Sequence, residues 1–187
     1  MRDYLKGLNI LTDAEIEWLY KQGVKKEIKK GEFFIRQGAV SDEVAFVNSG
    51  IFRSFYYSSG AEDVTYCLLF ENSFVTAYSS FITQEKTQEN IQALTDAEVI
   101  VFRRTLFNEL ESTGGNWLRL LKYFAEAEFV RMEKRFFLFQ KESAEKRYED
   151  LINNHAEFLQ LVPLNYLASY LGITQRHLSR IRKAMTN

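Results

Sequence analysis

The residues with the clearest chemical pattern lie near the end of the chain. Side chains with amide, guanidinium, ammonium and hydroxyl groups recur there, mostly at the three- and four-residue spacings that place them on one face of a helix. They are Thr174, Gln175, Arg176, Ser179, Arg180, Arg182 and Lys183. Because no Asp or Glu follows Glu157, this face is basic on a chain whose formal net charge is −1. Such groups hydrogen-bond to base edges and phosphates, so the face indicates contact with double-stranded DNA.

We expect different residues on this face to contact bases and phosphates. Arg176 and Arg180 have the geometry for guanine and Gln175 for adenine, while the hydroxyls and the remaining cations suit phosphates or flanking edges. His177 can reach a phosphate, although a surface histidine with another partner is the alternative. An ordinary helical hairpin with a solvated charged face is the other interpretation of the whole pattern.

The element that must position this face is a pair of helices joined by a tight turn. Leu164, Leu167, Ala168 and Leu171 form the apolar side of a first helix, which Gly172 ends because glycine enters the left-handed conformation without steric cost. Thr174 is expected to be the N-cap of the second helix, whose apolar residues Leu178 and Ile181 face the first helix. The segment therefore predicts a helix-turn-helix.

Composition limits the remaining possibilities. With 187 residues, 46% hydrophobic and 15% aromatic, the chain is expected to fold into two packed domains. Its net charge and a pI near 6.2 argue against nonspecific coating of nucleic acid. The first residues do not read as a signal peptide, and no apolar run is long enough to span a membrane. We therefore expect a cytoplasmic protein without a membrane partner.

Neither a catalytic centre nor a metal site is predicted. Cys67 is the only cysteine, which excludes an internal disulfide and a cysteine-built metal site, and its apolar surroundings favour a small buried side chain. His155 and His177 both lie outside the first domain, so haem ligation is not supported. No nucleophile–histidine–carboxylate set or phosphate loop is recognisable, and no cofactor is expected.

The first 113 residues predict a β-rich domain. Thr12 and Glu15 form a capping box at the start of a helix over residues 11–22. Glycines then follow at intervals of about ten residues, as in antiparallel sandwiches and barrels. The predicted strands are 33–36, 43–48, 51–57, 64–70, 90–94 and 98–103.

These segments together resemble one family. The succession KKGEFFIRQG (29–38), EVAFVNSGIFRSFY (43–56), IQALTDAEVIVF (91–102) and the helix-turn-helix is similar to the Crp/Fnr family of bacterial transcription regulators. The resemblance covers nearly the whole chain. It implies an α+β protein with a jelly-roll sensor domain over residues 1–113, a dimerisation helix over 114–140 and a winged helix-turn-helix domain over 141–187. It also implies a homodimer on a palindromic operator.

The sequence departs from this family at the cyclic-nucleotide pocket. Members that bind cyclic AMP carry a Gly-Glu pair and an Arg-Ser pair, and these positions fall here at about Thr76 and Ala77 and at Thr87 and Gln88. Because neither charge is present, we expect that cyclic AMP is not a tight ligand, although Lys86 could supply a substitute cation. An unknown small-molecule effector and a filled pocket both stay open. The residues expected to line the pocket are Thr76, Ala77, Tyr78, Ser79, Thr87 and Gln88.

A long helix is predicted after Gly115, with Asn116 as its cap. Its apolar stripe is too wide for a helix that packs on one surface only, which indicates two partners: the β-rich domain and the same helix of a second subunit. The residues expected at the dimer interface are Leu118, Leu121, Ala125, Phe129, Met132 and Phe136. Burial of the helix within a single subunit is the alternative.

Between the long helix and the helix-turn-helix, a hinge is expected near residues 139–143, followed by a charged helix. Residues 158–162 could form a short strand of a wing before Pro163, the only proline. A transcription regulator is the favoured function. A sensor module whose helix-turn-helix binds a protein partner is the alternative, and an enzyme has the least support.

Overall fold

The structure is a computed structural model that describes residues 1–156 and 158–186. Two four-stranded antiparallel sheets form its β-roll. The first has the order β1 (Val24–Ile28), β8 (Ala97–Arg103), β3 (Glu43–Ser49) and β6 (Phe74–Val75). The second has the order β2 (Phe33–Ile35), β7 (Asn90–Ala93), β4 (Phe52–Tyr57) and β5 (Asp63–Leu69). The six strands expected from the sequence are all present, within a residue or two at their ends.

The β-roll has apolar residues on both sides of its first sheet. Ala45, Val47, Val99 and Val101 are buried in a cluster that also contains residues of the second sheet. Phe46, which lies between two of them on β3, is buried in another cluster with residues of the N-terminal helices. The alternation follows from the two-residue period of a strand. Both faces of this sheet are therefore covered.

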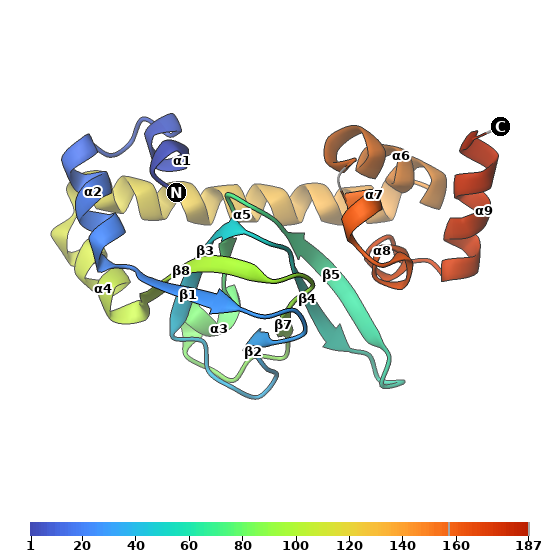
Figure 1. Ribbon diagram of the computed structural model, residues 1–187, viewed down its shortest axis with the longest axis horizontal. Helices are drawn as coiled ribbons and strands as arrows, with labels where there is room; N and C mark the ends of the chain where they lie inside the picture. Colours follow the sequence, from blue (N-terminus) through green and yellow to red (C-terminus); the bar gives the residue numbers. More distant parts are fainter. Residues whose placement is uncertain (157, 187) are drawn as a thin grey trace.

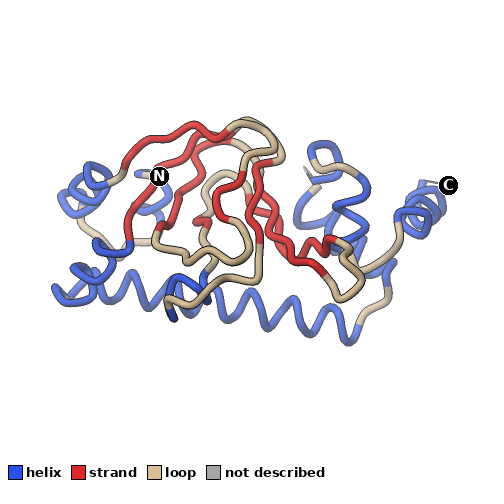
Figure 2. The backbone as a smooth tube through the Cα atoms, turned by 90° about the horizontal axis from the view of Figure 1, so that it is seen from below, coloured by secondary structure: helices blue, strands red, loops and turns tan. Residues whose placement is uncertain are grey.

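Helices gather at the two ends of one long helix. Near its start lie α1 (Arg2–Gly7), α2 (Asp13–Gln22) and α4 (Arg104–Thr113), while the short α3 (Tyr78–Thr83) follows β6. The long helix, α5 (Gly115–Lys141), runs along the β-roll, and Figures 1 and 2 show it from two directions. The capping box of α2 is confirmed, because Thr12 and Glu15 hydrogen-bond reciprocally.

Asn116 does not cap α5, contrary to the expectation. The N-cap is Gly114, without a side-chain hydrogen bond, and the Asn116 amide instead donates to Glu15 Oε2 at 3.1 Å. The amide thus joins the start of α5 to α2, a tertiary contact that cap preferences alone do not reveal.

The C-terminal domain contains α6 (Ala144–His155), α7 (Phe158–Leu161), α8 (Leu164–Tyr170) and α9 (Gln175–Thr186). The chain turns between α5 and α6, where Ser143 accepts the Lys146 N–H as an N-cap. The strand expected over residues 158–162 is wrong, because residues 158–161 form α7. A short apolar run does not distinguish a strand from a buried helical turn, and packing against α8 favours the helix.

Candidate nucleic-acid interface and ligand cavity

The turn between α8 and α9 has the geometry that its residue types predict. Gly172 has φ +69°, and a Cβ built on it would lie 2.8 Å from Phe139 Cε1, so both the backbone and the close packing require glycine. The Ile173 N–H donates to the Ala168 carbonyl at 3.0 Å, which closes the end of the first helix. Thr174 Oγ1 accepts the His177 N–H at 3.2 Å, so the predicted N-cap is confirmed.

The two helices share the small core expected for a helix-turn-helix. Leu178 is fully buried, and Leu167, Ala168, Leu171 and Ile181 are at most 4% exposed. Ala168 keeps the helices close, because a larger side chain would separate them. The core fixes the orientation of α9 and therefore of its polar face.

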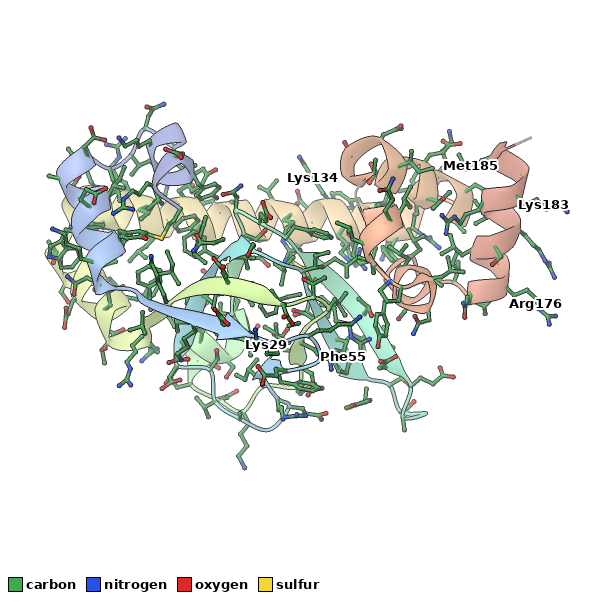
Figure 3. The ribbon with its side chains drawn as sticks, viewed as in Figure 1. Lys29, Phe55, Lys134, Arg176, Lys183 and Met185 are labelled. Carbon is green, nitrogen blue, oxygen red and sulfur yellow. The ribbon has the colours of Figure 1, made fainter. Side chains whose placement is uncertain are left out.

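The polar face of α9 is open to solvent. Gln175, Arg176, Arg180 and Lys183 are exposed, while Arg182 is half-buried. Figure 3 shows the Arg176 and Lys183 side chains pointing away from the rest of the molecule. Thr174 and Ser179 are exposed as well, but the Ser179 hydroxyl donates to the Gln175 carbonyl at 3.0 Å.

His177 is held by a neighbouring helix. Its Nε2 lies 3.6 Å from Glu145 Oε1 on α6, which agrees with a surface histidine that has another partner. Hydrogen bonds within the first turn of α6, together with His177, hold the pKa of Glu145 below its usual value. His177 therefore ties α9 to α6.

The helix-turn-helix docks on the β-roll through α8. The Thr65 N–H on β5 donates to Ser169 Oγ at 2.9 Å, and that hydroxyl donates to the Asp63 carbonyl at 3.3 Å. The Arg53 guanidinium lies 3.6 Å from the ring centre of Tyr166 on α8. Ile51, Leu68 and Leu94 of the β-roll belong to the same apolar cluster as the helix-turn-helix core. The second sheet and α8 thus form a continuous interface.

A cavity of about 860 Å³ lies between the β-roll and α5. Three of the six expected pocket residues, Thr76, Tyr78 and Ser79, line it. The other three do not: Ala77 and Thr87 are buried elsewhere, and Gln88 is exposed. Lys86 is also absent from the lining, so it does not supply a cation there.

The polar corner of this cavity is formed by residues that the sequence analysis did not single out: Tyr66, Glu89, Glu128 and Arg131. The Tyr66 hydroxyl donates to Glu89 Oε2, and Arg131 Nε donates to Glu128 Oε2 at 2.9 Å. Burial raises the pKa of Glu89, although the Tyr66 and Ser54 hydroxyls oppose that shift by hydrogen-bonding to the carboxylate. The three-residue spacing of Glu128 and Arg131 on a helix was the available signal.

Cys67 also lines the cavity and is 3% exposed, as expected of a small buried side chain. Arg131 Nη1 lies 3.0 Å from its sulfur. Burial raises the pKa of the Cys67 thiol despite this guanidinium. Burial and a raised pKa both reduce the thiolate character of Cys67, as is typical of a small buried side chain.

One side of α5 is apolar and largely exposed in the single chain, and four of its residues, Leu118, Leu121, Ala125 and Met132, also line the cavity. Phe129 is 68% exposed, Phe136 57%, Leu118 50% and Met132 43%. Ala125 is exposed too, whereas Leu121 is half-buried against the N-terminal cluster. Exposed aromatic residues at these spacings form a contiguous apolar surface of the kind that subunit interfaces bury.

Two kinds of feature are absent from residues 1–156 and 158–186. No group of three or more His, Cys, Asp and Glu side chains is placed to hold a metal ion there. No helix in the same residues combines the length and the apolar character that crossing a membrane requires.

Comparison with known proteins agrees with this architecture. Residues 25–113 match the cyclic nucleotide-binding domain family. No match was found among curated protein sequences. FixK2 from Bradyrhizobium japonicum superposes with a TM-score of 0.76 at 15% identity, over 88% of this chain and 84% of that chain.

Two further structures are similar over nearly the whole chain. A transcriptional regulator of the Crp/Fnr family from Eubacterium rectale has a TM-score of 0.72 at 14% identity, over 98% of this chain and 88% of that one. The catabolite activator protein of Thermus thermophilus has a TM-score of 0.60 at 17% identity, over 94% and 84%. Residues 25–113 are thus similar to the cyclic nucleotide-binding domain family, and the chain has a fold like that of the Crp/Fnr transcription regulators.

Proposed function

We propose that this protein is a homodimeric, DNA-binding transcription regulator of the cytoplasm. The observation that carries the proposal is the exposed face of α9, which is free of Asp and Glu and rests on a helix-turn-helix with a buried core. The similar Crp/Fnr fold supports the same conclusion. Each subunit would insert α9 into the major groove.

The direction of the side chains on α9 supports specific contacts. Arg176, Arg180 and Gln175 are exposed near the N-terminal half of the helix, where base edges lie in this mode of binding. Arginine pairs with guanine and glutamine with adenine through two hydrogen bonds. Lys183, Arg182 and Thr174 are better placed for phosphates, and Ser179 contributes less because its hydroxyl already donates to the backbone.

The outer face of α5 supports dimerisation. Phe129 and Phe136 are more than half exposed in the single chain, and a second copy of the helix would cover them. Two recognition helices about 34 Å apart would then read two half-sites of a palindrome. One helix alone covers too few base pairs for useful specificity.

The cavity supports control by a small molecule other than cyclic AMP. The arginine position of the family pocket holds Thr87, whose hydroxyl accepts the Glu89 N–H at 3.1 Å. Glu89 itself faces the cavity with a carboxyl group. A cyclic phosphate would approach an acid instead of a cation, which costs most of the affinity in a partly desolvated site.

In vitro selection of DNA sequences by the purified protein tests the proposal. The experiment contains no cyclic nucleotide and is repeated at two salt concentrations. We expect a two-fold symmetric site with half-sites one helical turn apart, and weaker binding at higher salt. The Arg176→Ala, Arg180→Ala double variant is the control, and it should enrich no site.

A single substitution refines the assignment. Arg180→Ala should weaken binding by about 1–3 kcal/mol and relax the preference at one position of each half-site. An unchanged site preference contradicts the role of Arg180. If the wild-type protein enriches no DNA at either salt concentration, and still enriches none when cell extract is added to supply an effector, the proposal is wrong.

A further inference from the structure

The cavity between the β-roll and α5 has the size of a ligand site. Its volume of about 860 Å³ lies within the roughly 300–1,000 Å³ of small-molecule pockets. Aromatic side chains, including Phe74, Tyr78, Phe107 and Phe124, supply much of its wall. An aromatic or otherwise apolar body therefore fits it.

Six charged residues line the cavity, and they divide equally between acids and bases: Glu89, Glu111, Glu128, Arg104, Lys122 and Arg131. Each of the three cations already has a partner. Arg104 Nε donates to the Phe81 carbonyl at 2.9 Å, and Lys122 Nζ lies 2.9 Å from Glu126 Oε1. Arg131 pairs with Glu128 through two of its nitrogens. Lys122 and Arg131 are thus each paired with a carboxylate, whereas the partner of Arg104 among the described residues is a neutral carbonyl of α3.

Glu89 differs from Glu128, the other acid of the polar corner. Its hydrogen-bond partners among the described residues are neutral hydroxyls, those of Tyr66 on β5 and Ser54 on β4. On the α5 side, Arg131 favours its ionised form and Glu128 disfavours it, and these two residues neutralise each other. Once Glu89 is ionised, the corner formed by Glu89, Glu128 and Arg131 therefore has one negative charge in excess.

We propose that the cavity takes a small amphipathic organic cation, with an aromatic or apolar body against the phenylalanines and a protonated amine against Glu89 and Tyr66. This inference rests on the proposed function only in treating the cavity as the effector site. An amine donates hydrogen bonds to the carboxylate and supplies the missing positive charge. An anion would add a second negative charge beside Glu89, and a neutral body would leave the carboxyl without an ionic partner.

Calorimetric titration with three indoles of nearly equal size tests the charge preference. Tryptamine is a cation at neutral pH, tryptophol is neutral and indole-3-acetate is an anion. We expect tryptamine to bind about tenfold more tightly than tryptophol, and indole-3-acetate to bind most weakly. Equal affinities, a reversed order or no binding of any of the three would overturn the inference.

Two matched substitutions locate the preference. Glu89→Gln keeps an acceptor for the Tyr66 hydroxyl but removes the charge, so it should abolish the difference between tryptamine and tryptophol. Glu85→Gln makes the same change at an exposed residue that does not line the cavity, so it should keep the wild-type order. A tryptamine preference that survives Glu89→Gln would place the amine elsewhere and refute the site.

The titration contains no DNA, so its outcome is independent of the DNA selection. Tight binding of cyclic AMP without binding of tryptamine would reject the inference and leave the DNA-binding function standing. Binding of tryptamine by a protein that selects no DNA would support the inference and reject the DNA-binding function.

Discussion

The contact between Arg53 and Tyr166 should be measurable as a coupling between the β-roll and the helix-turn-helix. Arg53 is 3% exposed. Its guanidinium carbon lies 3.9 Å from the ring centre of Phe55 and 3.6 Å from the ring centre of Tyr166. Its Nη2 donates to Asp63 Oδ2 at 2.8 Å. A cation over an aromatic ring contributes about 2 kcal/mol when both are desolvated. Since Asp63 is 40% exposed, its ion pair with Arg53 contributes less.

A double-mutant cycle isolates this contact. The variants are Arg53→Met, which keeps an apolar stem, Tyr166→Leu and their combination, and the quantity measured is the free energy of unfolding by urea. We expect a coupling energy of about 1–2 kcal/mol between positions 53 and 166. Each single variant should also loosen the docking of α8 and increase proteolysis near residues 139–143.

The control cycle pairs Arg53→Met with Phe55→Leu. Arg53 and Phe55 belong to the same strand, so their coupling should persist whether or not α8 docks on the β-roll. A coupling within about 0.3 kcal/mol of zero between positions 53 and 166, with the control coupling intact, would refute the docked arrangement.

Three further predictions concern the turn, the subunit interface and the cavity. Gly172→Ala should lower the free energy of unfolding by about 1–2 kcal/mol more than Gly115→Ala, because both glycines have positive φ but only Gly172 would contact Phe139; calorimetry checks this. Phe136→Glu should convert the proposed homodimer to a monomer in analytical ultracentrifugation while the circular dichroism stays unchanged, and an unchanged sedimentation coefficient would contradict the proposed interface. Burial raises the pKa of Glu89, so the folded state binds the Glu89 proton more tightly than the unfolded state does. The contribution of Glu89 to the free energy of unfolding is therefore fully present below the unfolded pKa near 4.5 and is lost as pH rises through the folded pKa. Urea titrations of wild type and Glu89→Gln from acid to neutral pH should show a smaller decline in the variant.

The helix-turn-helix was predictable because its signals are local. Gly172, Thr174 and the apolar spacing of Leu167, Leu171 and Leu178 act within a few residues of each other, and their conformational preferences agree. The strands could be predicted equally well, since the two-residue alternation of apolar and polar side chains is also a short-range signal.

The cavity was only partly predictable, since its polar corner is assembled from distant segments. Glu89 immediately precedes β7, whereas Glu128 and Arg131 belong to α5. No short-range rule brings Glu89 next to these two residues. The family resemblance pointed to Thr87 and Gln88, but the next residue in the sequence is the one that faces the cavity. Asn116 is a similar case, because its amide is used in a contact with Glu15 and not in a cap.

The contact of Ser169 with Thr65 has a consequence for solubility. β5 is the outermost strand of its sheet, so one side of its backbone has no neighbouring strand. There the Ser169 hydroxyl accepts a hydrogen bond from the Thr65 N–H, and α8 covers part of the strand. Uncovered edge strands pair with other chains and promote aggregation. Variants that undock α8 should therefore aggregate before they unfold, and the helix that positions the recognition element would also protect the protein from self-association through its sheet.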